Sequence, residues 1–111
     1  FLFIATGTGI SPFHCLTRSC PGLDYRLVHG IRTLDECYDY EVYERTRLVS
    51  CVSRENGGDY SGRVTGWLRD NPVSGGVLVY LCGNCDMIYE VYDILGTQGV
   101  SADRIHAEVY F

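Results

Sequence analysis

The chain has 111 residues, enough for one domain built around one hydrophobic core. Its net charge is −5 at pH 7 and it has no lysine- or arginine-rich run, which argues against a nucleic-acid-binding surface. No apolar run approaches the roughly 20 residues that a membrane-spanning helix requires, and the opening FLFIAT is too short for a secretory signal.

Apolar runs of strand length recur at 1–6, 25–30, 47–53, 76–82 and 105–111. The middle runs are nearly continuous in Val, Leu, Tyr and Cys, as in strands that are covered on both faces. Segments with helical patterns lie between these runs. Strands that alternate with helices predict right-handed crossovers and a parallel sheet.

The helical segments have recognisable beginnings and ends. Ser11-Pro12 is expected to begin a short first helix. Thr33 to Glu36 has capping-box spacing and leads into a predicted helix over CYDYEVYE. The segment GRVTGWLRD is expected to end before the breaker Asn71-Pro72. In the last segment the apolar residues fall on one helical face, which comprises Met87, Ile88, Val91, Ile94 and Leu95.

A glycine-rich turn, Gly7-Thr8-Gly9, follows the first strand and precedes the proline-started helix. Ligands of parallel sheets bind at the carboxyl ends of the strands, so this turn is a candidate site. Glycines allow the backbone to approach a phosphate, and the helix N-terminus favours the anion. The alternative is a tight turn without a ligand, because a lone glycine-rich turn is a weak signal.

Arginines follow the next strands at the same predicted edge. Arg32 follows the second strand, Arg54 the third, and Arg63 the glycine-rich loop ENGGDYSG. Three guanidiniums and the Ser53 hydroxyl are suited to one phosphate. A dinucleotide with a 2′-phosphate calls for such a set, whereas NAD favours an acidic residue on the ribose. The alternative is solvated surface arginines.

The cysteines and histidines indicate whether the chain is suited to disulfide formation, thiol redox chemistry or metal binding. The six cysteines are Cys15, Cys20, Cys37, Cys51, Cys82 and Cys85. Because the rest of the sequence is typical of a self-sufficient α/β core, we expect reduced thiols and a cytoplasmic protein. The spacing of Cys82 and Cys85 leaves a thiol oxidoreductase open as an alternative. The histidines lack metal-ligand spacing and no G-x-S-x-G elbow is present, so no metal site or serine triad is expected.

Taken in order, the stretches IATGTGISPF, LVHGIRTLDECYDYE, CVSRE, GRVTGWL, YLCGNCDMI and AEVYF resemble the NADP-binding domain of the ferredoxin–NADP reductase superfamily, in particular its bacterial branch. The resemblance covers essentially the whole chain, 1–111, which starts inside the first strand of the family. The expected fold is a three-layer, doubly wound α/β sandwich with a five-stranded parallel sheet in the order 3-2-1-4-5. The FAD-binding barrel that precedes this domain in the family is missing from the sequence.

The resemblance assigns roles to individual residues. The loop that cradles the pyrophosphate and nicotinamide ribose would include Thr6, Gly7, Thr8, Gly9 and Pro12. The 2′-phosphate would be held by Arg32, which follows Gly30, and by Ser53, Arg54 and Arg63. The residues beside the nicotinamide would be Cys82, Gly83, Asn84 and Met87. Glu108 would serve proton transfer and positioning, and Tyr110 would lie against the flavin. Cys85 departs from the family pattern, and Phe111 is an extra terminal aromatic.

These residues imply the NADP(H)-binding half of an FAD-dependent reductase, in which a hydride moves between NADP(H) and the flavin. Its partners would be an FAD-binding domain of the same polypeptide and ferredoxin or flavodoxin as the electron carrier. One alternative is the NAD(P)H-binding domain of an oxygenase or cytochrome reductase component. Another is a nucleotide-binding module without turnover of its own. The fragment alone is expected to be inactive, since its chemistry belongs to nicotinamide and flavin.

Overall fold

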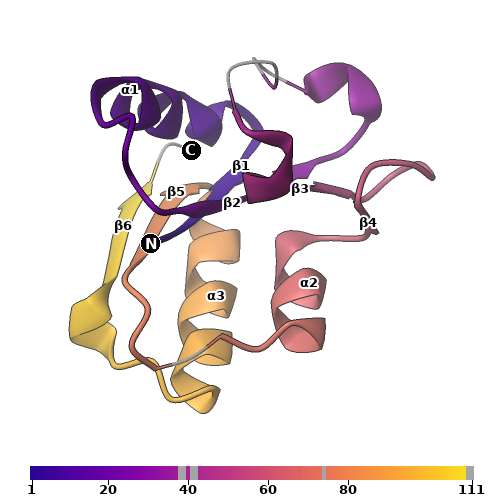
Figure 1. Ribbon diagram of the computed structural model, residues 1–111. Helices are drawn as coiled ribbons and strands as arrows, with labels where there is room; N and C mark the ends of the chain where they lie inside the picture. The colour runs from indigo at the N-terminus through magenta and orange to yellow at the C-terminus, as the bar shows by residue number, and fades with distance from the viewer. Residues whose placement is uncertain (38–39, 41–42, 74, 110–111) are drawn as a thin grey trace.

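The computed structural model describes residues 1–37, 40, 43–73 and 75–109 (Figure 1). The strands are β1 (Leu2–Thr6), β2 (Arg26–Ile31), β3 (Leu48–Val52), β4 (Tyr60–Ser61), β5 (Val79–Gly83) and β6 (Ile105–Val109). The α-helices are α1 (Ser11–Ser19), α2 (Val64–Asp70) and α3 (Cys85–Thr97). Short 3₁₀ turns are η1 (Gly7–Ile10), η2 (Leu34–Glu36), η4 (Arg45–Arg47) and η5 (Ala102–Arg104).

The strands form one parallel sheet with the order β4-β3-β2-β1-β5-β6. The five strands predicted from apolar runs keep their expected neighbours, but the prediction of a five-stranded sheet is wrong. The additional strand, β4, has two residues; its Tyr60 pairs with Cys51 of β3, and its Ser61 pairs with Val52. It lies in the glycine-rich loop after β3, where no apolar run marks a strand.

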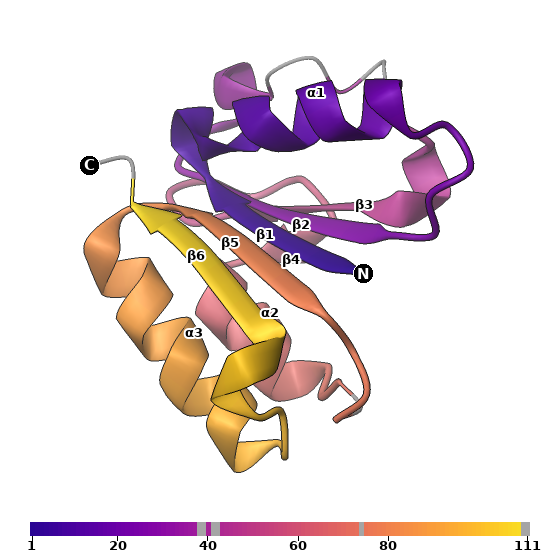
Figure 2. The ribbon, with the colours of Figure 1, turned by 90° about the vertical axis from the view of Figure 1, so that its left-hand side faces the viewer.

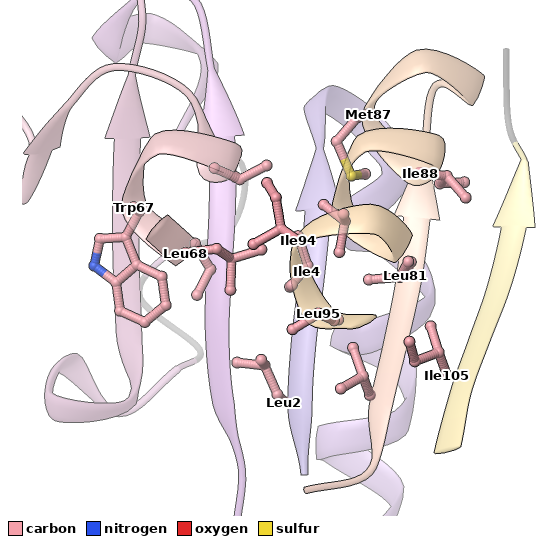
Figure 3. Packing of buried hydrophobic residues seen from close by; sticks show 14 of the residues in the cluster. Leu2, Ile4, Trp67, Leu68, Leu81, Met87, Ile88, Ile94, Leu95 and Ile105 are labelled. Atoms are coloured by element: carbon pink, nitrogen blue, oxygen red, sulfur yellow. The ribbon is translucent and has the colours of Figure 1, made fainter. Parts of the chain in front are cut away.

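Helices cover both faces of the sheet, which gives three layers (Figure 2). Along β1 the side chains alternate: Leu2 and Ile4 join the cluster packed against α2 and α3, and Phe3 and Ala5 join the cluster packed against α1. Figure 3 shows part of the first cluster, in which the α3 residues pack with Trp67 and Leu68 from α2 and with side chains of β1, β2, β3, β5 and β6. The buried faces explain the nearly continuous apolar strands.

The α-helices begin and end close to the predicted residues. Pro12 lies in the first turn of α1, and α2 ends at Asp70, directly before Asn71-Pro72. The Asn84 side chain accepts a hydrogen bond from the Met87 amide at 2.8 Å and caps α3. The predicted apolar face of α3 is buried, with Met87, Ile88, Val91, Ile94 and Leu95 in the core.

The helix predicted over CYDYEVYE is not found among the residues that the structure describes in this segment. The capping box forms between Thr33 and Glu36, but it begins a 3₁₀ turn of three residues. That turn ends at Glu36, because the backbone of the next residue, Cys37 (φ −74°, ψ 77°), leaves the helical region. Residues 38–39 and 41–42 of the segment lie outside the described residues. None of the described helices is long and apolar enough to cross a bilayer.

Candidate functional site

The carboxyl end of β1 passes directly into the glycine-rich turn η1. Gly7 has a φ of +54°, a conformation that favours glycine. At Gly9 an added Cβ would lie 2.5 Å from the carbonyl oxygen of Cys82, so this backbone can approach β5 only without a side chain. The turn predicted to cradle a pyrophosphate therefore lies against the end of β5, with α1 starting behind it.

The ends of β1 and β5 are held together by a direct hydrogen bond. The Asn84 amide donates to Thr6 Oγ1 at 3.2 Å. Between them, Gly83 has a φ of +155°, and a Cβ there would overlap Thr6 Oγ1. The Cys82-Gly83-Asn84 stretch and the Thr6–Gly9 loop thus form one continuous piece of backbone surface.

His29 supports this loop from beneath and is fully buried. Its Nε2 lies 2.7 Å from the carbonyl oxygen of Gly7, and its Nδ1 lies 2.7 Å from the Tyr40 hydroxyl. A carbonyl only accepts, so Nε2 carries the hydrogen and Nδ1 accepts from Tyr40. Burial lowers the pKa of His29 to about 4, so the ring is neutral at neutral pH.

A cavity of about 500 Å³ opens beside these strand ends. Nine of the predicted site residues line it: Thr6, Gly7, Gly30, Arg32, Ser53, Arg54, Arg63, Asn84 and Met87. At Gly30 a Cβ would lie 2.9 Å from Val64 Cγ1 and 3.3 Å from Thr6 Cγ2, so a side chain there would narrow the cavity. The space at this edge is therefore kept open by a glycine.

The three predicted arginines lie in the wall of this cavity but differ in their surroundings. The Arg54 amide donates to the carbonyl oxygen of Arg32 at 2.9 Å, which brings the ends of β2 and β3 together. Arg32 pairs with Glu36, with its terminal nitrogen 3.1 Å from Oε2. Arg54 and Arg63 are exposed and make no ion pair within the described part of the chain. Two guanidiniums are thus available to an anion in the cavity.

The sequence interpretation missed the acidic and small residues of the cavity wall. These are Glu36, Cys51, Thr65, Asp86 and Glu90. Glu36 lies four residues after Arg32, and Asp86 and Glu90 have the same spacing at the start of α3. For Asp86 and Glu90 this spacing places two side chains on one face of the predicted helix and is the signal that was available. The cavity therefore carries both signs of charge.

Cys82 and Glu108 lie outside the cavity wall but next to each other. They are register partners on the neighbouring strands β5 and β6. Burial is the larger cause and the nearby Glu108 carboxylate the smaller one of a raised pKa of the Cys82 thiol, about 11. The thiol is therefore protonated at neutral pH, which does not suit a nucleophilic thiolate. Cys85 is half-buried in the first turn of α3.

The remaining predicted residues are placed as follows. Thr8, Gly9 and Pro12 belong to the η1 turn and the start of α1, and Gly83 ends β5; none of them lines the cavity. Tyr110 and Phe111 lie outside the described residues. Within the described ranges, no group of three His, Cys, Asp or Glu residues is arranged to hold a metal ion.

Comparison with solved structures identifies the kind of protein that shares this fold. A cytochrome P450 reductase from Amycolatopsis has a TM-score of 0.78 and 27% identity over 97% of this chain and 36% of its own. The flavohem-like FAD/NAD-binding domain of nitric oxide dioxygenase from Vibrio cholerae has a TM-score of 0.77 and 18% identity, over 98% of this chain and 50% of its own.

A third solved structure is a ferredoxin–NADP⁺ reductase from Plasmodium falciparum in complex with 2′P-AMP. It has a TM-score of 0.64 and 21% identity, over 99% of this chain and 52% of its own. The chain thus spans between 36% and 52% of the length of these three proteins. The expected similarity to one part of ferredoxin-reductase-like proteins is confirmed at the level of the fold. No family model matches the sequence, and no curated protein matches it.

Proposed function

We propose that the chain is the NADP(H)-binding domain of an FAD-dependent reductase that moves a hydride between NADP(H) and the flavin. The observation that carries this proposal is the pair of exposed arginines Arg54 and Arg63, which make no ion pair with a described residue and lie in the wall of a cavity that also reaches the glycine turn. Guanidinium groups bind a phosphate, and a glycine-rich turn before a helix binds the pyrophosphate of a dinucleotide. The similarity to reductases supports the same assignment.

In this proposal the loop residues Thr6, Gly7, Thr8, Gly9 and Pro12 hold the pyrophosphate and the nicotinamide ribose. These residues would bind through uncharged backbone amides. At Gly7, which lines the cavity, the absence of a side chain lets a ligand approach closely. The 2′-phosphate is bound by Arg32, Ser53, Arg54 and Arg63. The Plasmodium reductase in complex with 2′P-AMP supports a 2′-phosphate as the ligand class.

The nicotinamide is assigned to Cys82, Gly83, Asn84 and Met87. When bound, the nicotinamide and the flavin supply the two ends of the hydride transfer. Cys82 orients the nicotinamide as a neutral, buried thiol, while Glu108 positions it and exchanges a proton with solvent. We assign Tyr110 the contact with the flavin. The register pairing of Cys82 with Glu108 supports a joint role for these two residues.

An uncovered side of the sheet supports a second domain as the partner. On β6, His106 and Glu108 are exposed, and the His106 ring stacks on Tyr80 with 5.1 Å between ring centroids. Phe1 is 46% exposed beside Tyr80. We propose that an FAD-binding domain of the same polypeptide covers this surface, that ferredoxin or flavodoxin carries the electrons, and that the protein is cytoplasmic.

Nucleotide titration tests the assignment of the 2′-phosphate. Isothermal titration of the chain is expected to show tighter binding of NADP⁺ than of NAD⁺. Arg54→Ala should weaken NADP⁺ by about tenfold, since a charge-assisted hydrogen bond is lost, and should leave NAD⁺ unchanged. Arg18→Ala is the matched control, because Arg18 is exposed on α1 and does not line the cavity. Equal binding of both nucleotides, or unchanged binding in Arg54→Ala, contradicts the proposal.

A second candidate is the NAD(P)H-binding domain of an oxygenase or cytochrome reductase component. The 27% identity with the Amycolatopsis cytochrome P450 reductase favours it over a module without turnover. The residues that precede Phe1 in the native protein distinguish these readings. A flavin-binding domain there supports a reductase, and rates of electron transfer to ferredoxin, flavodoxin and a cytochrome then identify the acceptor.

A further inference from the structure

We propose that Glu36 sets the preference between NADP(H) and NAD(H) by holding the Arg32 guanidinium in an ion pair inside the cavity. The inference rests on the proposed function, since it concerns the same nucleotide site. It assigns a role to a residue that the sequence motifs mark only as part of a capping box. A bound 2′-phosphate then reaches Arg54 and Arg63 directly but reaches Arg32 only in competition with Glu36.

The contacts of Glu36 are numerous for a residue at a cavity wall. Its Oε1 accepts from the Arg32 amide at 2.9 Å, the Thr33 amide at 3.3 Å and Arg32 Nε at 3.3 Å. Its Oε2 accepts from the terminal guanidinium nitrogen of Arg32 at 3.1 Å. These bonds lower the pKa of Glu36, so the carboxylate is ionised at neutral pH. The pair is a bidentate carboxylate–guanidinium contact, the geometry that a phosphate also requires.

The exposure of the pair fits a role in ligand selection. The Glu36 side chain is 16% exposed and the Arg32 side chain is 64% exposed, and both line the cavity with Arg54 and Arg63. A 2′-phosphate must therefore compete with the Glu36 carboxylate for the Arg32 guanidinium, whereas NAD(H), which lacks this phosphate, does not depend on Arg32. Arg54 and Arg63 thus favour NADP(H), and Glu36 reduces that preference by occupying Arg32.

Glu36→Gln separates the charge of the residue from its structural part. The amide oxygen of glutamine can replace Oε1 and keep the bonds to the two backbone amides, as a capping box with glutamine does. The amide nitrogen then faces the terminal nitrogen of Arg32, and two donors cannot bond to each other. The substitution therefore removes the Glu36 contact from the end of the guanidinium while it preserves the turn.

The test measures the dissociation constants of NADP⁺ and NAD⁺ by isothermal titration for the unmodified chain, Glu36→Gln and Glu44→Gln. Glu44→Gln removes the same charge from a comparable pair, Arg47–Glu44 at 3.1 Å, outside the cavity. In Glu36→Gln the preference for NADP⁺ over NAD⁺ should rise about fivefold, because an exposed competing ion pair is removed. In Glu44→Gln it should stay within about twofold of the original value.

The same titrations in an Arg32→Ala background show whether the effect passes through Arg32. There, Glu36→Gln should change the preference by less than about twofold, as a double-mutant cycle requires for coupled residues. The inference is overturned if Glu36→Gln leaves the preference unchanged, if Glu44→Gln raises it equally, or if the effect persists in Arg32→Ala. If the unmodified chain binds neither nucleotide, the proposed function is overturned and this inference falls with it.

Discussion

A single buried imidazole connects the glycine turn η1 with the segment that follows β2. His29 is fully buried, bonds the Gly7 carbonyl and the Tyr40 hydroxyl, and has a pKa lowered to about 4 by burial. In the unfolded chain a histidine takes up a proton near pH 6.5. Between these values the unfolded state binds the additional proton, so the free energy of unfolding falls as the pH falls.

We expect His29 alone to remove on the order of 3 kcal/mol from the free energy of unfolding between about pH 6.5 and about pH 4. Urea denaturation across this range measures the loss. His29→Gln, which keeps a side-chain amide for hydrogen bonding, should abolish most of this slope whatever its effect on stability at neutral pH. Equal slopes in the two proteins would show that His29 is not the titrating group. Carboxyl groups whose pKa is lowered in the folded protein, such as Glu36, change the free energy of unfolding at lower pH than His29 does.

At the scale of elements, the junction of β1, β5 and α3 depends on one glycine. A Cβ at Gly83 would overlap Thr6 Oγ1 and would lie 3.0 Å from Met87 Cε, in a backbone with φ +155°. Gly83→Ala should therefore lower the free energy of unfolding by about 2 kcal/mol or more. Gly96→Ala is the matched control: Gly96 lies in α3 with nothing within 4 Å of an added Cβ, and alanine there should stabilise by about 0.5–1 kcal/mol. Thermal unfolding distinguishes the two, and a neutral Gly83→Ala would contradict the tight junction.

The elements that the sequence predicts are those whose local pattern agrees with their packing. Four of the five apolar runs became strands that bury side chains on both faces, whereas β6 buries only Ile105; α3 formed where five apolar residues share one side. Strand β4 carries no such pattern, since its two residues gain their pairing only from the neighbouring β3. The capping box at Thr33 predicts where a turn starts but not how far it continues.

The candidate site was predictable to the extent that it follows from the topology. Residues after parallel strands meet at one edge, and this is why Arg32, Ser53 and Arg54 line one cavity. The contacts of each side chain could not be predicted in the same way, because they depend on rotamers and on elements distant in the chain. The bond of His29 to Gly7, 22 residues away, and the occupation of Arg32 by Glu36 are contacts of this kind.

On the scale of the whole molecule, charge is distributed unevenly between the two ends of the sheet. Where the strands begin, Arg47 is paired with Asp24 at 2.8 Å. Where they end, Arg54 and Arg63 make no ion pair with any described residue. The chain as a whole carries a net charge of −5, which repels a nucleotide at long range. The proposed binding of an anionic nucleotide therefore depends on the local positive charge of Arg54 and Arg63.

This distribution predicts that NADP⁺ binding is more sensitive to salt than NAD⁺ binding. Between about 50 mM and about 500 mM NaCl, the dissociation constant should rise about tenfold for NADP⁺ and less than about threefold for NAD⁺, since screening weakens the attraction between arginine and the additional phosphate. Titration calorimetry at several salt concentrations gives the two slopes. In Arg54→Ala the slopes should approach each other, because one of the two guanidiniums proposed to meet the 2′-phosphate is gone. Equal slopes in the unmodified chain would mean that the arginines at this end do not meet the 2′-phosphate, and that the pyrophosphate alone accounts for the electrostatic part of binding.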